Sequence, residues 1–423
     1  MTKPLSIRFK ISLLTIISLL FSGVCRAQDT VVNQEKRTHF LEHFNLSVYI
    51  QAQFQWGEPA AMLKVGSPNS NPAKSFNRMG IRRGGIQLSY QESFGSVVFH
   101  VDASERGVSL KDAYLTLEEP WLKAFSVKAG VFIRPFGNEM IYSSTVRESP
   151  ETSTLIQTLF PEERDIGASA IFQMPESSKW HFLRAEAAVI CGNGIKLESD
   201  NRKDFIGRVS AEKRFDAPNS VIQIGGGLSY YTGSVYQGTE DVYTIKRNQY
   251  LLNHNAKNLG KYAKREYFGA DLQLYILHSV VGNTLLRAEC IYGQQPGAKN
   301  DSKSPNTVAL PTNDVYIRPF LGGYAQWVQD FGKLPLAAVF RFDWYNPNLK
   351  LKGENIGLNY STNGDIAVMT YGVGLLWRAT NHLLLQAYYE FNRNEVSSHL
   401  IGYEKDIKND VFTFRLQYKF SLH

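Results

Sequence analysis

The sequence has few cysteines and, beyond its first 30 residues, no long apolar run. Its 423 residues include only Cys25, Cys191 and Cys290, which are too few for a disulfide scaffold and lack the spacing of zinc ligands. No later stretch reaches the about 18 consecutive apolar residues that a membrane-spanning helix needs. Together with a mean hydropathy of −0.25, this excludes a bundle of membrane-spanning helices.

The excess of positive charge is small outside the first 27 residues. The formal net charge is +7, from 46 basic and 39 acidic residues. Residues 1–27 hold four of the basic residues and none of the acidic ones, so 42 against 39 remain without them. The charge is therefore no argument for nucleic-acid binding.

The first 27 residues have the layout of a secretory signal peptide. Lys3, Arg8 and Lys10 precede an apolar stretch at 11–21, and small residues stand at Cys25 and Ala27. This order is typical of an export signal, here cleaved after Ala27. We expect a signal peptide at 1–27, a short periplasmic segment at 28–44 and one domain at 45–423.

Aromatic residues are abundant, at 13% of the chain, and apolar and polar residues alternate through most of it. In the last segment Phe412, Phe414 and Leu416 alternate with Thr413 and Arg415. Period two is the pattern of a strand whose two faces meet different surroundings. We predict sixteen strands, at 45–56, 81–91, 96–104, 110–118, 124–133, 166–174, 181–190, 205–213, 220–231, 266–277, 284–292, 316–328, 337–345, 366–378, 382–392 and 411–420.

The predicted connections are long on one side and short on the other. The long ones are 57–80, 134–165, 232–265, 293–315, 346–365 and 393–410, and short links such as 119–123 and 379–381 lie between them. This asymmetry is typical of outer-membrane barrels, and only a closed sheet pairs every backbone group in hydrocarbon. We predict an all-β fold, a transmembrane antiparallel β-barrel. A soluble β-sandwich, the alternative, would not explain sixteen segments sharing one apolar face.

The connection 134–165 differs from the other long ones. It holds Leu155, Ile156, Leu159 and Phe160 close together, which an exposed loop has no reason to do. Folding into the lumen and packing on the inner wall would bury these side chains. The alternative is an extracellular loop packed on a neighbouring subunit or on other loops.

Basic residues of the lumen are the candidate functional residues. Sixteen strands leave an aqueous channel, and charges inside it set selectivity. Strand parity turns eight bases and nine acids inward. The bases are Arg83, Lys128, Arg184, Arg208, Arg287, Arg341, Arg415 and Lys419. The inward-folded loop would add Arg134, Arg147 and Arg164. The candidate constriction and anion path comprises Arg83, Lys128, Arg134, Arg147, Arg164, Arg208 and Arg341.

Residues 82–170 resemble the phosphate-selective porin O and P family. The resemblance rests on RRGGIQLSYQESFGSVVFHVD (82–102), GVSLKDAYLTL (107–117), VKAGVFIRPFG (127–137) and LFPEERDIGASA (159–170). It covers roughly a fifth of the chain. It implies a sixteen-stranded outer-membrane porin, generally trimeric, with the third extracellular loop folded into the pore; that loop corresponds to 134–165.

The same resemblance implies a ladder of arginines that leads to lysines at the constriction. Lys128, Arg134, Arg147 and Arg164 could supply part of such a path. The constriction stretch, however, contains no lysine and carries five glutamates, Glu139, Glu148, Glu151, Glu162 and Glu163. This composition favours a general or weakly anion-preferring channel.

We therefore expect a water-filled channel for passive diffusion of small hydrophilic solutes, including anions such as phosphate or polyphosphate. An outer-membrane binding or adhesion barrel that uses its long loops is the alternative. An outer-membrane enzyme is a further alternative, but the sequence has no HExxH, no GxSxG and no phosphate loop around Gly225–Gly227. We predict no catalytic residue, no metal and no cofactor.

Overall fold

The computed structural model describes residues 42–278 and 280–422. The predicted signal peptide and residues 28–41 of the predicted periplasmic segment lie outside these residues. The chain divides into two compact units, and the larger one, Asn45–Leu422, contains the sheet described below.

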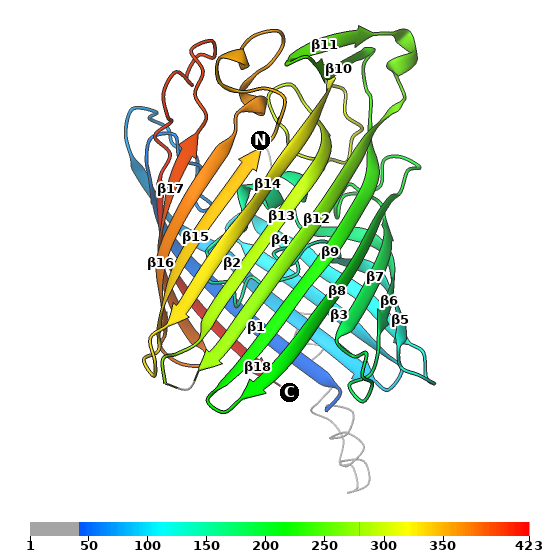
Figure 1. Ribbon diagram of the computed structural model, residues 1–423, viewed down its shortest axis with the longest axis vertical. Helices are drawn as coiled ribbons and strands as arrows, with labels where there is room; N and C mark the ends of the chain where they lie inside the picture. The colour runs from blue at the N-terminus through cyan, green and yellow to red at the C-terminus, as the bar shows by residue number, and fades with distance from the viewer. Residues whose placement is uncertain (1–41, 279, 423) are drawn as a thin grey trace, which may run out of the picture. The chain divides into compact units, whose positions relative to one another are not determined.

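Sixteen antiparallel strands close into a barrel (Figure 1). They are β1 (Phe44–Gly57), β2 (Phe76–Glu92), β3 (Gly95–Ser104), β4 (Gly107–Glu118), β5 (Phe125–Ile133), β6 (Arg164–Gln173), β7 (Leu183–Ile190), β8 (Asp204–Ala217), β9 (Ser220–Tyr236), β12 (Tyr262–His278), β13 (Thr284–Gly297), β14 (Val315–Asp330), β15 (Leu336–Asn346), β16 (Val368–Arg378), β17 (Leu383–Asn394) and β18 (Val411–Leu422). The barrel closes where β1 pairs with β18, from Leu46↔Leu422 to Gly57↔Val411. The predicted fold class and all sixteen predicted strands are confirmed.

The strands form because apolar side chains face outward and polar ones inward. In β1, Gln51, Gln53 and Gln55 are buried inside the barrel, whereas Ile50 beside them is 46% exposed. On the outer surface Trp327 stacks on Phe340 with ring centroids 5.5 Å apart. An exterior of exposed apolar side chains needs an apolar solvent around it.

The connection between β9 and β12 departs from the prediction of a polar loop. It contains a hairpin, β10 (Asp241–Lys246) and β11 (Gln249–His254), followed by the 3-10 turn η1 (Ala256–Asn258). Strand β10 pairs in parallel with the start of β14, and Tyr243 stacks on Tyr316 with ring centroids 4.3 Å apart. The hairpin thereby packs with residues of the 347–367 connection, which carries η2 (Gly353–Asn355) and η3 (Asn363–Asp365).

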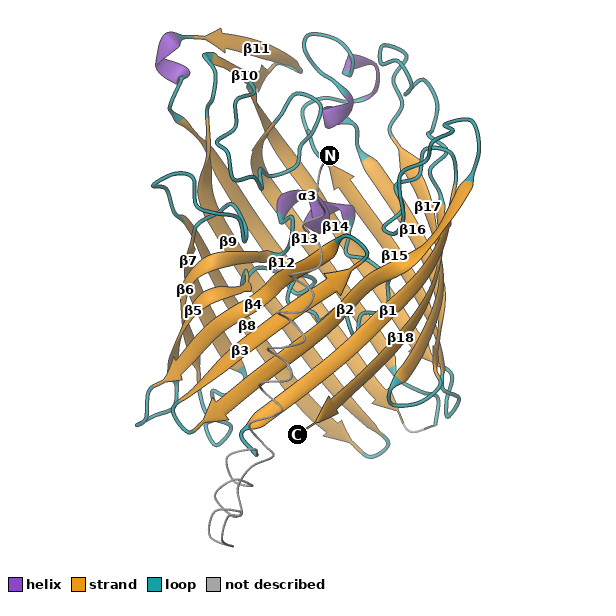
Figure 2. Cartoon of the chain, turned by 180° about the vertical axis from the view of Figure 1, so that it is seen from behind, coloured by secondary structure: helices purple, strands orange, loops and turns teal. Residues whose placement is uncertain are grey.

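The connection between β5 and β6 folds into the barrel, as predicted. Figure 2 shows its single helix, α3 (Thr154–Leu159), within the ring of strands. Ser153 caps this helix by accepting a hydrogen bond from the backbone N–H of Ile156. Leu155, Ile156 and Phe160 are each 1% exposed and belong to one buried cluster with inward-facing wall residues. We call residues 134–163 the lumen loop.

Among the described residues, no helix combines the length and apolar character required to cross a bilayer. Cys191 and Cys290 are free thiols.

Candidate functional site

Ion pairs fasten the lumen loop to the wall at β13 and β15. Glu139 pairs with Arg341 at 2.6 Å, and Glu148 pairs with Arg287 at 2.5 Å. Both carboxylates are at most 5% exposed. Glu139 also accepts hydrogen bonds from the backbone N–H and the hydroxyl of Ser153, so the same carboxylate holds the start of α3. A buried carboxylate needs such partners, because desolvation penalises its charge.

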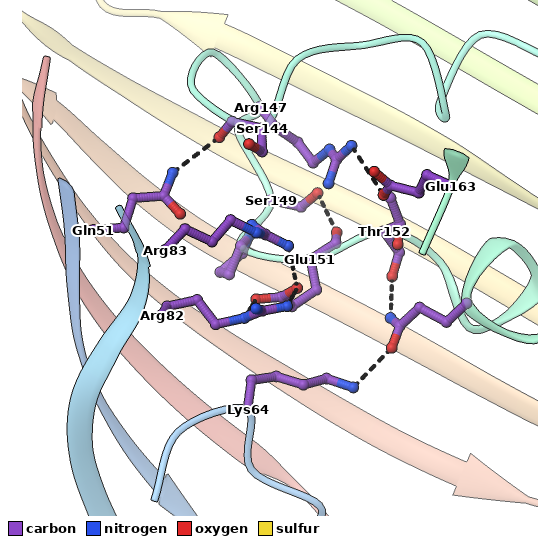
Figure 3. A network of polar contacts seen from close by, with 12 residues as sticks. Gln51, Lys64, Arg82, Arg83, Ser144, Arg147, Ser149, Glu151, Thr152 and Glu163 are labelled. Carbon is purple, nitrogen blue, oxygen red and sulfur yellow. Dashed lines mark hydrogen bonds and ion pairs between the residues drawn. The ribbon is translucent and has the colours of Figure 1, made fainter. Parts of the chain in front are cut away.

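A third anchor joins the loop to β2 and β18, and Figure 3 shows its β2 part, Arg82 and Arg83 beside Glu151. Glu151 accepts hydrogen bonds from Arg82, Arg83 and Arg415 at 2.8–3.0 Å. Burial alone raises the pKa of the Glu151 carboxyl, and the three guanidinium groups outweigh burial and hold this pKa well below its usual range. Beside this cluster, Lys64 of the β1–β2 connection donates to Gln157 of α3 at 2.7 Å.

Most loop glutamates are therefore turned away from the open part of the lumen. Glu139, Glu148 and Glu151 contact the wall, and Glu162 pairs with Lys196 at 3.2 Å. Glu163 alone among the five lines the cavity described next. These glutamates offset the arginines less than their number suggests, because sequence composition does not show which way the side chains point.

A cavity of about 460 Å³ lies between the lumen loop and the inner wall. Seven lysine or arginine side chains line it, against four carboxylates. The bases are Arg83, Lys111, Lys128, Arg164, Arg184, Arg208 and Lys419, and the acids are Asp102, Asp112, Glu163 and Glu186. The wall of the cavity therefore has an excess of positive charge.

Five neighbouring strands each contribute one of these bases. Lys111 lies on β4, Lys128 on β5, Arg164 on β6, Arg184 on β7 and Arg208 on β8. For three of the five bases, the nearest carboxylate is shared between two bases or lies outside the cavity. Lys128 and Arg184 both pair with Glu186, at 3.2 and 2.8 Å, and Arg208 pairs with Asp271, which does not line the cavity.

Lys111 reaches the cavity because of a β-bulge. Along β3 and β4, Val101 pairs with Leu110, whereas His100 pairs with Asp112, which leaves Lys111 as the extra residue. A bulge re-aims a side chain that regular alternation would point the other way. Lys111 Nζ lies 3.8 Å from Asp102. Regular parity on the sequence missed this lysine. The local signal is a change of phase in the apolar alternation, from even positions up to Leu110 to odd positions from Ala113 onward.

Of the seven candidate residues, Arg83, Lys128, Arg164 and Arg208 line the cavity, and the structure brings them together on its wall. Arg164 contacts Asp112 at 3.3 Å and Glu163 at 2.8 Å.

The other three candidates, Arg134, Arg147 and Arg341, lie outside the cavity. Arg134, predicted to lie near the narrowest point, is 2% exposed and binds Asp165 through two nitrogen atoms. Arg147 is buried in the loop, where it donates to the carbonyls of Glu139 and Tyr142. Arg341 is the wall partner of Glu139. These three arginines hold the loop in place.

No group of three or more His, Cys, Asp or Glu side chains arranged to hold a metal ion occurs within residues 42–278 and 280–422. His100 lines the cavity and contacts Asp112 at 3.0 Å.

Comparison with protein-family models found no match, and comparison with curated protein sequences found none either. Among solved structures, the chain is similar to OprB of Pseudomonas putida, with a TM-score of 0.57 and 10% identity over 91% of this chain and 96% of that chain. It is also similar to an anion-selective porin of Comamonas acidovorans, with a TM-score of 0.50 and 8% identity over 90% of this chain and 99% of that chain. At such identities the likeness establishes a common barrel fold.

Proposed function

We propose that this chain is an outer-membrane porin, a water-filled channel for passive diffusion of small hydrophilic solutes, and that it prefers anions. The observation that carries the proposal is the excess of bases over carboxylates on the wall of the internal cavity. Fixed charges of one sign along a narrow aqueous passage raise the local concentration of the opposite ion.

The outer surface supports a membrane location. Outward-facing residues such as Leu228, Phe268 and Leu272 are more than half exposed, which is costly in water and favourable in hydrocarbon. Closure of the sheet leaves no unpaired strand edge in the lipid. The signal-like residues 1–27 support export from a Gram-negative-type bacterium.

Phosphate or polyphosphate selectivity is the narrower form of this proposal. It is supported by the resemblance of residues 82–170 to phosphate-selective porins and by the lysines that the wall, rather than the loop, supplies to the cavity: Lys111, Lys128 and Lys419. Assembly as a homotrimer rests on the same resemblance, and native mass measurement in detergent tests it.

The test is the reversal potential of the purified protein in a planar bilayer under a KCl gradient. The proposal requires stepwise channel insertion and a reversal potential whose sign shows that chloride crosses more readily than potassium. Cation preference, or no channel activity from a folded barrel, would contradict it. Titration with phosphate then tests the narrower form, which requires block of the chloride current at micromolar concentrations.

A further inference from the structure

One side of the cavity is formed by the end of β5 and the first half of the lumen loop, and this side is uncharged. Nine cavity-lining residues lie between Phe132 and Thr145, and none of them is charged. Five are apolar, Phe132, Ile133, Pro135, Met140 and Ile141, and the other four, Tyr142, Ser143, Ser144 and Thr145, carry hydroxyls. Of the apolar five, Ile133 and Ile141 keep solvent-exposed surface, whereas the other three are buried. Ile141 is 44% exposed, although it lies inside the barrel. A large apolar side chain left open to an aqueous passage has no structural need to be there.

The positively charged side chains of the cavity come from other parts of the barrel wall. The cavity bases on β4–β8 come from the barrel wall, one from each strand. A solute in the cavity therefore meets cationic side chains from the wall and apolar side chains from the end of β5 and the start of the loop.

The two kinds of side chain meet at Lys128. Its ammonium group lies 5.3 Å from the centre of the Phe132 ring and 5.6 Å from that of the Tyr114 ring. Phe132 is 1% exposed, so the partly exposed Tyr114 ring is the one that an anion paired with Lys128 would have beside it. Apolar surface on an anion in the cavity would be removed from water by the Tyr114 ring or by Ile141, which is favourable in proportion to the area buried.

Inorganic phosphate has no apolar surface with which to use this half of the cavity. The hydroxyls of Tyr142, Ser143, Ser144 and Thr145 can bind phosphate oxygens. Next to Ile133 and Ile141, however, these oxygens would lose water without replacement, which costs free energy. A carboxylate with an aromatic or branched carbon body uses both halves at once.

We propose that the solutes favoured by this passage are small organic carboxylates with an aromatic or branched apolar part, rather than inorganic phosphate. This inference rests on the proposed anion-preferring channel and names the substrate class of the same cavity. It is an alternative to the phosphate-selective form of that proposal.

The experiment compares potassium benzoate, acetate and phosphate against KCl with the full chain in planar bilayers. We expect the benzoate-to-acetate permeability ratio to exceed the ratio of their mobilities in free solution. We also expect benzoate to reduce the chloride current at lower concentration than phosphate does. The opposite order of block, or a permeability ratio equal to the mobility ratio, would overturn the inference.

A matched pair of variants assigns the effect to the apolar half. Ile141→Ser should lower the benzoate-to-acetate ratio by about fourfold, the effect of losing about one buried methylene group. Val146→Ser is the control, because Val146 lies on the same loop and is 48% exposed but does not line the cavity. Equal benzoate-to-acetate permeability ratios in the two variants, with channel insertion retained, would overturn the inference.

The outcomes separate the two proposals. Channels that prefer chloride to potassium but treat benzoate and acetate alike contradict only the substrate class. Channels that prefer cations contradict the proposed anion preference itself.

Discussion

Arg341 on β15 and Glu139 on the lumen loop are 202 residues apart in the sequence and meet in a buried 2.6 Å ion pair. The pair joins the middle of one strand to the segment that occupies the lumen. Because Glu139 also binds Ser153 at the start of α3, one carboxylate couples the wall, the loop and its helix.

Removal of this carboxylate should loosen the loop. Glu139→Ala removes one of the two carboxylates that pair with the buried Arg341 and leaves Asp343. Loss of one partner of a buried pair typically costs about 3–5 kcal/mol. We expect lower stability in a urea titration of the reconstituted protein and larger, noisier single-channel conductance. Glu162→Ala is the control, since Glu162 lies on the same loop in an exposed pair with Lys196; unchanged conductance in Glu139→Ala would contradict an anchoring role.

Selectivity should respond to cavity bases and not to buried ones. Arg164→Gln and Lys111→Gln each remove a positive charge from the cavity wall, so both should move the reversal potential in a KCl gradient toward zero. Arg134→Gln should leave the reversal potential unchanged and lower stability by about 3–5 kcal/mol, because it removes the ion-pair partner of the buried Asp165. If Arg134→Gln shifted the reversal potential as much as Arg164→Gln does, the placement of Arg134 outside the cavity would be contradicted.

The Glu151 anchor should withstand mild acid. The folded-state pKa of Glu151 lies well below its usual value, so its stabilising contribution is complete above the unfolded pKa of about 4.3 and disappears only as pH falls through the folded value. We expect constant conductance between pH 7 and pH 5. Glu151→Gln should give at pH 7 the altered conductance that the unsubstituted protein shows only in strong acid. Titration of the anchor between pH 5 and pH 7 would contradict this.

Asp365 should hold the connections at the mouth on the long-loop side of the barrel. Its carboxylate is fully buried and accepts hydrogen bonds from Arg318, Tyr250 and Asn348 at 2.6–2.9 Å. Asp365→Ala should expose the 347–367 connection to trypsin, with cleavage at least about tenfold faster if the local cost exceeds about 1.4 kcal/mol. The control is Asp406→Ala, whose exposed pair with Arg393 is 3.5 Å long. Equal cleavage of the two variants would contradict the assignment.

The barrel could be predicted from the sequence because lipid and lumen impose one alternation on every strand. The lumen loop could be predicted because Leu155, Ile156 and Phe160 had to be buried somewhere. These inferences depend on local pattern alone, and the pattern survives in each strand separately.

The details of the cavity depend on partners distant in the sequence. Lys111 turns inward through a bulge that exists only in the pairing of β3 with β4. Arg134 leaves the cavity because Asp165 is buried next to it. The hairpin β10–β11 was missed because two six-residue strands in a polar stretch give too short an alternation, and because the tyrosine contacts that hold them come from β14 and the 347–367 connection.

The five bases on β4–β8 lie apart from the ion-pair anchors on β13, β15 and β18, whereas Arg83 on β2 both lines the cavity and pairs with Glu151 of the loop. Mutations of the β4–β8 bases and mutations of the β13, β15 and β18 anchors should therefore affect different properties, selectivity in the first case and loop position in the second. Substitutions at the bases of β4–β8 could change which solutes pass, while the anchors on β13, β15 and β18 stay unchanged. The cavity bases could therefore be redesigned to make a sensor for other anions, while the contacts that hold the lumen loop in place are kept.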